Sequence, residues 1–146
     1  MPEGTDMAAL SELVTDDRVV LHRVVGDWRE AISAVAGPLI ADGSIMPAYV
    51  DSMIKAVDEF GPYIVLAPHV ALAHARPDGA VNRQAMSVMT LGEPVYFGHD
   101  ENDPVSIVFC LAATDNRSHM DALKSFVSIA ADPQRKPKDL DSVEVV

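Results

Sequence analysis

The sequence predicts an α/β fold with three layers, in which helices flank one central mixed β-sheet. Two observations support this prediction. Apolar runs of strand length alternate along the chain with longer segments whose apolar residues recur at helical spacing. Of the 146 residues, 49% are hydrophobic, which is enough for one sizeable core in a chain too short for two ordinary domains. Residues 1–146 are therefore predicted to form a single domain.

The first half of the chain is predicted to contain one strand and three helices. The second helix has a well-defined start, because Asp27 and Glu30 have the spacing of a capping box. Pro38 lies inside this helix and predicts a kink or local break. Pro47 suits the first turn of the third helix. The predicted elements are a helix over 7–14, a strand over 18–25, a helix over 27–42 and a helix over 47–60.

The second half of the chain is predicted to supply most of the strands. An apolar run breaks at Pro68, and a second short apolar run ends at His74, before a polar turn over 77–82. Ser118 is the predicted N-cap of the last helix. The other predicted elements are strands over 63–67, 84–91 and 105–112 and a helix from 118 to about 130.

Charge and cysteine content narrow the classes of function. The net charge of −11 argues against nucleic-acid binding, which requires a basic face. The single cysteine, Cys110, lies within an apolar run and is predicted to be a buried small side chain, so the chain has no internal disulfide. No apolar run approaches the roughly 20 residues of a membrane span, and the N-terminus lacks a signal-peptide pattern. These features predict a soluble cytoplasmic protein.

The segment GPYIVLAPHVALAHARPD, residues 61–78, carries the most distinctive chemistry. In this segment His74 lies at the end of a stiff apolar run, and Arg76 follows two residues later. A neutral imidazole is a competent nucleophile toward phosphorus, and a planar guanidinium suits the oxyanions of a phosphoryl group. The segment therefore predicts a phosphohistidine site.

A second histidine is predicted to join this site. His119 occupies the first turn of the helix that follows the buried strand over 105–112. Ligand sites in open α/β sheets gather at the carboxyl ends of strands, and helix N-termini attract phosphate. His69, His74 and His119 could instead form a zinc site, although no established zinc-ligand motif is present. Of the remaining histidines, His22 is interpreted as a half-exposed strand residue and His99 as a solvated loop residue.

Several further motifs follow in order along the chain. They are the segments GPYIVLAP and ALAHARP, followed by LGEPVYFG, ENDPV, FCLAATDN and SHMDAL, and they belong to a likeness that covers roughly residues 10–130. Together they resemble the EIIA components of the mannitol/fructose superfamily, type 2, of the phosphoenolpyruvate-dependent sugar phosphotransferase system. The resemblance is strongest to the ascorbate-type branch. It implies the EIIA type 2 fold, a mixed sheet flanked by helices.

The resemblance also implies roles and partners. His74 stands where the family accepts phosphate from HPr and passes it to an EIIB cysteine, for uptake of a sugar or ascorbate-like substrate through the membrane protein EIIC. His119 stands where the family contacts the phosphoryl group, and Arg76 is expected to stabilise its oxygens. Such a phosphotransferase needs no metal or other cofactor. The residues proposed as an apolar rim for successive partners are Val70, Leu72 and Tyr96.

The sequence departs from the family pattern in several places. The family usually has glycine where His69 stands and proline where Ala73 stands, so the loop before the nucleophile is expected to be reshaped. His99 replaces what is commonly a small polar residue. The tail over 131–146 is proline-rich and is predicted to be poorly ordered, apart from a candidate strand at 143–146. Without the usual terminal helices, apolar surface would be exposed or covered by a partner such as a second copy of the chain.

Two alternatives to a transport role stay open at this point. One is a regulatory EIIA-like protein that signals through its phosphorylation state rather than feeding transport. The other is a zinc-dependent hydrolase that uses the three histidines named above as metal ligands. The sequence does not identify the transported sugar, because in such a system EIIC contacts it.

Overall fold

A computed structural model describes residues 13–77 and 79–130 of the chain. Within them, one five-stranded sheet has the order β1-β4-β5-β3-β2. Strand β1 pairs in parallel with β4, and β3 pairs in parallel with β5, whereas the β4–β5 and β2–β3 pairs are antiparallel. The strands are β1 (Val19–Arg23), β2 (Val65–Ala67), β3 (Val70–Ala73), β4 (Ala85–Val95) and β5 (Val105–Ala112). The helices are the short 3₁₀ helix η1 (Asp16–Arg18), α2 (Trp28–Ala41), α3 (Pro47–Phe60) and α4 (Asn116–Ala130).

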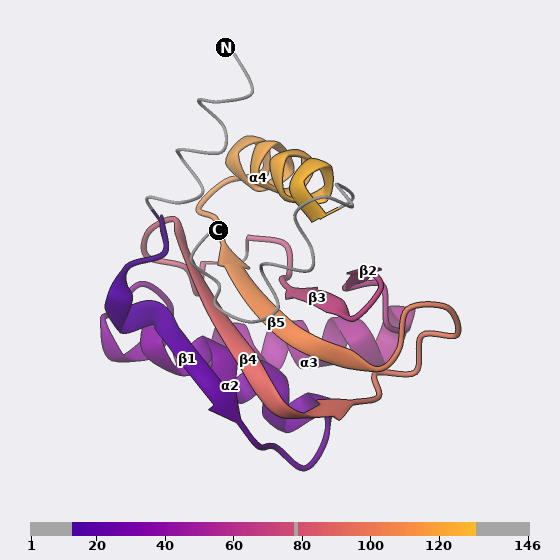
Figure 1. The fold of residues 1–146 in the computed structure, drawn as a ribbon. Helices are drawn as coiled ribbons and strands as arrows, with labels where there is room; N and C mark the ends of the chain where they lie inside the picture. The colour runs from indigo at the N-terminus through magenta and orange to yellow at the C-terminus, as the bar shows by residue number, and fades with distance from the viewer. Residues whose placement is uncertain (1–12, 78, 131–146) are drawn as a thin grey trace.

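Helices cover both faces of the sheet. Figure 1 shows α2 and α3 behind the sheet and α4 in front of it. Each face has its own hydrophobic core. The core on the α2 and α3 side includes Ile32 and Met53, and the core on the α4 side includes Leu72 and Phe126. The predicted three-layer α/β fold with a mixed sheet is therefore confirmed.

The helix boundaries follow from local signals in the sequence. Asp27 caps α2 by accepting a hydrogen bond from the Glu30 N–H at 2.9 Å, and the Glu30 carboxylate accepts one from the Gly26 N–H at 2.8 Å. Pro47 starts α3, whose bounds match the prediction, and Gly61 ends it with φ of 87°. Only glycine adopts that backbone conformation without a steric cost, so this glycine fixes the direction in which the chain leaves α3.

Some boundaries differ from the prediction. Helix α2 continues through Pro38 to Ala41 without a break. Ser118 is not the N-cap of α4, because the helix begins at Asn116 and the Asp115 carboxylate accepts the Ser118 N–H at 2.7 Å. Most of the helix predicted over 7–14, and the whole tail over 131–146, lie outside the described residues.

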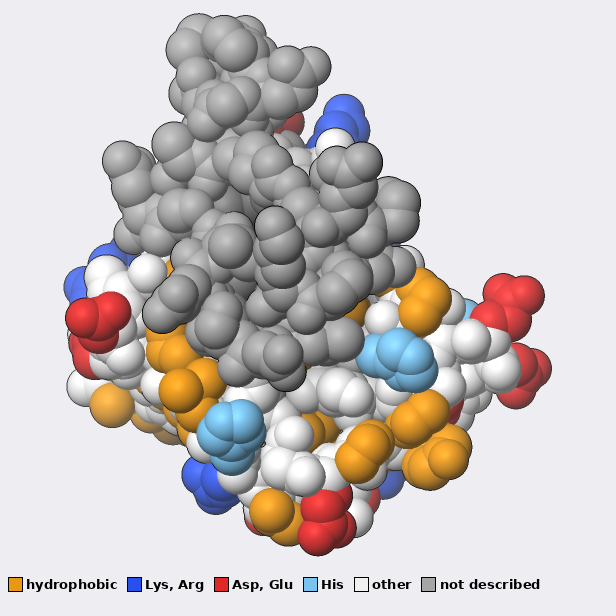
Figure 2. All heavy atoms as spheres, viewed as in Figure 1, with side chains coloured by type: hydrophobic (Ala, Val, Ile, Leu, Met, Phe, Trp, Pro, Cys, Tyr) orange, Lys and Arg blue, Asp and Glu red, His pale blue; other side chains and the backbone are white. Residues whose placement is uncertain are grey.

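The surface shows where the charge of −11 is distributed. On the face drawn in Figure 2, Lys and Arg side chains of the described residues are scattered rather than gathered into one basic patch, and acidic side chains lie around the margins. Among residues 13–77 and 79–130, every helix falls short of the length and apolar character that crossing a bilayer requires.

Candidate functional site

The candidate site lies where two neighbouring parallel strands end. Strands β3 and β5 pair in parallel, with Ala73 opposite Cys110, so their carboxyl ends meet at the same edge of the sheet. His74 follows the last residue of β3 directly. The chain leaving β5 turns into α4, whose fourth residue is His119. Sheet topology therefore brings together two histidines that the sequence separates by two strands.

The orientation of His74 follows from the pleat of β3. Leu72 belongs to the core beneath α4, whereas Ala71 and Ala73 belong to the opposite core. The alternation of side chains along a strand accordingly directs His74 toward the α4 side, where only 7% of its surface is exposed. The Nδ1 atom lies 2.7 Å from the Leu72 carbonyl oxygen. A carbonyl oxygen only accepts hydrogen bonds, so Nδ1 carries the hydrogen and Nε2 has the free lone pair.

Tyr63 holds His74 from the other side. Its hydroxyl donates to the carbonyl oxygen of His74 at 2.9 Å. Its ring meets the imidazole edge to face, with centroids 5.2 Å apart and an interplanar angle of 84°. Both ends of the residue are thus held, the ring through Nδ1 and the backbone through the carbonyl group.

His119 lies next to His74 in the site. The two ring centroids are 5.4 Å apart, and His119 is also only 7% exposed. Among the described residues, its Nδ1 atom is a buried side-chain polar atom with no hydrogen-bond partner. A buried polar atom without a partner carries a desolvation penalty, and such atoms recur where a ligand completes the site.

Burial keeps both imidazoles neutral. Desolvation lowers the pKa of His74 to about 4; the hydrogen bond to the Leu72 carbonyl opposes this shift, and the neighbouring His119 adds to it. The pKa of His119 is also lowered, first by burial and then by the positive charge of Arg76. At neutral pH His74 is therefore a neutral imidazole, the form of the ring that can act as a nucleophile.

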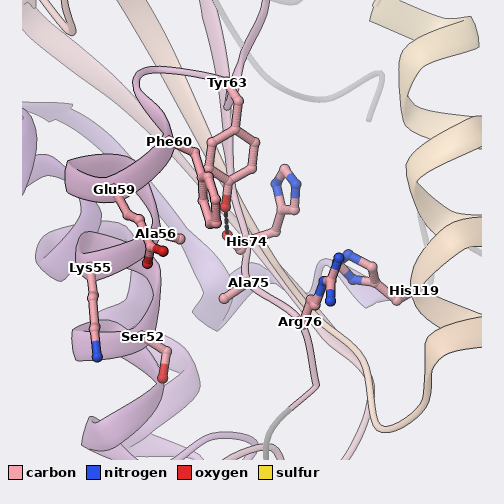
Figure 3. Close-up of a pocket in the computed structure, with 10 residues that line it drawn as sticks. All are labelled: Ser52, Lys55, Ala56, Glu59, Phe60, Tyr63, His74, Ala75, Arg76 and His119. Carbon is pink, nitrogen blue, oxygen red and sulfur yellow. Dashed lines mark hydrogen bonds between the residues drawn. The ribbon is translucent and has the colours of Figure 1, made fainter.

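A pocket of about 540 Å³ opens in front of these groups. In Figure 3 the His74 ring lies between Tyr63 and His119, and the Arg76 guanidinium lies toward His119. Helix α3 forms the opposite wall. The lining residues are Ser52, Lys55, Ala56, Glu59, Phe60, Tyr63, His74, Ala75, Arg76 and His119. The three residues predicted for the site thus line one pocket.

The apolar rim predicted for this site is wrong. Val70 and Leu72 are buried, because α4 covers the sheet face toward which they point. Tyr96 is 71% exposed, but it follows Val95, which pairs with the first residue of β5 at the far edge of the sheet. The exposed aromatic residues at the pocket are Phe60 and Tyr63, on either side of the glycine that ends α3.

The remaining histidines lie away from the site. His69 precedes β3 at the opposite end from His74, and its Nδ1 lies 2.8 Å from the Pro104 carbonyl oxygen. His22 is exposed on the edge strand β1, and His99 accepts backbone N–H groups within its own loop. Within residues 13–77 and 79–130, no three His, Cys, Asp or Glu side chains gather as they would around a metal ion. The three-histidine zinc site is therefore not formed.

The cysteine behaves as the sequence predicted. Cys110 is fully buried in β5, with its Sγ 3.9 Å from the Met53 Sδ, and burial raises the pKa of its thiol to about 12. A thiol that stays protonated inside a core is a poor nucleophile. This residue belongs to the packing of the sheet against α3 rather than to the site.

Comparison with known proteins supports this class of fold. Residues 12–140 match the family "Phosphoenolpyruvate-dependent sugar phosphotransferase system, EIIA 2". The chain is 40% identical over 117 residues to the ascorbate-specific EIIA component of Mycoplasma pneumoniae, a match that covers 80% of this chain and 73% of that protein. The solution structure of the mannitol-specific cryptic enzyme IIA CmtB from Escherichia coli superposes with a TM-score of 0.79 at 27% identity, covering 92% of this chain and 90% of that one.

The same fold occurs in a complex. The structure of enzyme IIA mannitol with phosphorylated enzyme IIB mannitol from Escherichia coli matches with a TM-score of 0.75 at 21% identity, covering 91% of this chain and 93% of that one. At that identity the likeness concerns the fold. The fold and the family match define a class of phosphotransferase-system component. The chain belongs to the EIIA type 2 family of the phosphoenolpyruvate-dependent sugar phosphotransferase system.

Proposed function

We propose that this EIIA protein carries a phosphoryl group on Nε2 of His74, accepting it from HPr and passing it to EIIB. The observation that carries the proposal is the hydrogen bond of His74 Nδ1 to the Leu72 carbonyl oxygen. That bond leaves Nε2 as the basic nitrogen of a neutral imidazole at a pocket wall.

The transfer exchanges the bond between phosphorus and the donor for a bond to His74. The Nε2 lone pair of His74 attacks phosphorus as the bond between phosphorus and the donor atom of HPr breaks, and that electron pair returns to the donor atom. The Nδ1 hydrogen stays on His74, where the Leu72 carbonyl stabilises the positive charge that develops on the ring. Such transfers depend on in-line positioning and charge neutralisation, and this chain's own residues supply both at the site.

His119 and Arg76 act on the phosphoryl oxygens. The buried Nδ1 of His119, next to the His74 ring, has no hydrogen-bond partner among residues 13–77 and 79–130, so a phosphoryl oxygen would supply one. Arg76 lines the same pocket and adds the positive charge that a dianionic phosphoryl group requires. The exposed rings of Phe60 and Tyr63 supply apolar surface for the successive protein partners.

The direct test is phosphorylation by enzyme I, HPr and labelled phosphoenolpyruvate. Wild-type protein should take up label and pass it to a matching EIIB, whereas His74→Ala should take up none. Label on the folded His74→Ala protein would overturn the proposal. His22→Ala is a matched control. His22 is an exposed histidine on the edge strand β1, which β4 and β5 separate from β3.

The substrate class follows from the similarity to ascorbate-specific components, and we propose an ascorbate-like or sugar substrate taken up through the membrane component EIIC. A cytoplasmic location fits exchange with HPr and EIIB. Screening labelled protein against candidate EIIB partners would identify the branch. Transfer to none of the EIIB proteins of the source cell, with normal labelling by HPr, would favour the regulatory alternative.

A further inference from the structure

The peptide group that joins His74 to Ala75 is held on both of its edges. On one edge, the Tyr63 hydroxyl donates to the His74 carbonyl oxygen at 2.9 Å. On the other edge, the Ala75 N–H donates to the Tyr49 hydroxyl oxygen at 3.0 Å. Both tyrosines belong to the α3 region, Tyr49 as its third residue and Tyr63 in the turn that follows it. Helix α3 and the turn that follows it thus each hold this peptide group through one tyrosine hydroxyl.

Tyr49 reaches beyond this peptide group. Its hydroxyl is fully buried and lies 3.1 Å from the Ala75 carbonyl oxygen and 2.9 Å from the Leu111 carbonyl oxygen. A tyrosine has one hydroxyl hydrogen, so these two carbonyl oxygens share it while the oxygen accepts the Ala75 N–H. Leu111 is the penultimate residue of β5, and the chain runs from there into α4 and His119.

The hydroxyl therefore connects the exits of two strands. It touches the segment that follows β3 and carries His74, and it touches the end of β5 that leads to His119. The last pair of the β3–β5 ladder is Ala73 with Cys110, so beyond it the pairing of these two strands no longer fixes the spacing of the two exits. The Tyr49 hydroxyl supplies a hydrogen-bonded link at the point where the ladder ends.

We propose that Tyr49 and Tyr63 form a tyrosine clamp that positions His74 for phosphoryl transfer. Tyr49 sets the distance between the His74 segment and the β5 exit, and with it the spacing of the two histidine rings. Tyr63 fixes the rotation of the His74–Ala75 peptide group and packs against the imidazole. Both act through the backbone and ring of His74, so they are positioning residues. The inference rests on the proposed role of His74 as the phosphoryl carrier.

The clamp matters because transfer between two proteins tolerates little misplacement. A displacement of about 1 Å in a reacting group costs on the order of 10²-fold in rate. Phenylalanine fills the same space as tyrosine and removes only the hydroxyl. Tyr49→Phe would leave the Ala75 and Leu111 backbone groups without their shared partner, and the end of β3 would be free to shift.

Tyr49→Phe, with Ser87→Ala as its matched control, tests the clamp. Ser87 is also fully buried, and its hydroxyl donates to the Val35 carbonyl oxygen between β4 and α2, away from the pocket. Each variant thus loses one buried hydroxyl group and its hydrogen bonding. We expect Tyr49→Phe to slow single-turnover transfer from phosphorylated HPr by about 10- to 100-fold, with the concentration of HPr that gives half-maximal rate unchanged.

Nuclear magnetic resonance of the unphosphorylated protein gives a readout that stability alone would not move. We expect the His74 ring signals of Tyr49→Phe to show a mixture of tautomers, and Ser87→Ala to keep the wild-type pattern and rate. Equal losses of rate in Tyr49→Phe and Ser87→Ala would overturn the clamp, as would a wild-type rate in Tyr49→Phe.

Tyr63→Phe keeps the proposal testable if Tyr49→Phe does not fold, because Tyr63 is partly exposed. Its expected effect has the same direction, and an unchanged rate together with unchanged His74 signals would then overturn the clamp. The proposed function fails separately: label on the His74→Ala protein would overturn the role of His74. A wild-type rate in the tyrosine variants, with no label on His74→Ala, would overturn the clamp alone.

Discussion

The rings of His74 and His119 lie with their centroids 5.4 Å apart and their planes at 46°. The relationship depends on the parallel pairing of β3 with β5, which ends both strands at one edge of the sheet. The Leu72 carbonyl oxygen fixes the hydrogen of His74 on Nδ1, and the buried Nδ1 of His119 has no hydrogen-bond partner within the described part of the chain. In the proposed function the first ring is the nucleophile and the second binds a phosphoryl oxygen.

The phosphoryl linkage should be on Nε2 of His74. The Leu72 carbonyl oxygen, 2.7 Å from Nδ1, blocks that nitrogen and fixes its hydrogen. Nitrogen and phosphorus magnetic resonance of the phosphorylated protein distinguishes the two linkages. A phosphoryl group found on Nδ1 would mean that the hydrogen bond breaks during transfer.

Burial of His74 should make stability depend on pH. Its pKa is about 4 in the folded protein, below the ordinary value of 6.5, so the unfolded chain binds a proton that the folded protein excludes. The resulting stability is fully present above about pH 6.5 and is lost as the pH falls toward 4. It amounts to on the order of 3 kcal/mol. Urea unfolding across this window should show a smaller pH dependence for His74→Gln, and identical curves would contradict the assignment.

His119→Ala should slow transfer without abolishing phosphate acceptance. Loss of one group that stabilises a developing oxyanion typically costs about 10²-fold in rate. His119→Gln keeps a donor of similar length and should be intermediate. Rapid-quench measurement of transfer from phosphorylated HPr gives both rates. Wild-type kinetics in His119→Ala would show that the ring only fills space.

Arg76→Ala should raise the pKa of His119 and also slow transfer. The guanidinium charge is one of the two causes that lower this pKa, so its removal moves the value upward. Arg76→Lys keeps the charge and should preserve the titration while losing bidentate contact with phosphoryl oxygens. Histidine titration by magnetic resonance, combined with transfer rates, separates the two effects. An unshifted pKa in Arg76→Ala would place the charge too far away to matter.

His69→Gly should leave phosphoryl transfer unchanged. His69 has φ of 70°, a backbone conformation that favours glycine, and it lies at the opposite end of β3 from His74. Relief of this strain offsets the loss of the hydrogen bond to the Pro104 carbonyl oxygen, so the free energy of unfolding should change by less than about 1 kcal/mol. Chemical denaturation and the transfer assay measure the two quantities. Slower transfer would give this histidine a role that the structure does not indicate.

The sequence predicted most of the elements, because their signals are local. The bounds of α3 and β5 follow from Pro47, the glycine after Phe60 and an apolar run whose one polar residue is Ser106. The cap of α4 was harder to predict because Asp115 and Ser118 are both good N-caps. The path of the chain leaving β5 decides between them.

The apolar rim was mispredicted for a different reason. A short run such as Val70–Ala73 has the same pattern whether one face of its sheet is covered or both. Here both faces are covered, so these side chains are buried, and the exposed aromatic surface comes from the turn after α3. The family usually has glycine where His69 stands. The structure gives the reason, because the backbone at this position has a positive φ, which glycine adopts readily.

The sequence by itself determined the family, the order of strands and helices, and the identity of the residues that can carry phosphoryl chemistry, since these depend on residue type and local spacing. Tertiary structure alone decided that His69 stays apart from His74 and His119, which nitrogen of His74 is free and which tyrosines hold its backbone. Those properties depend on parallel pairing and burial, which join segments far apart in the chain and remove water from the imidazoles.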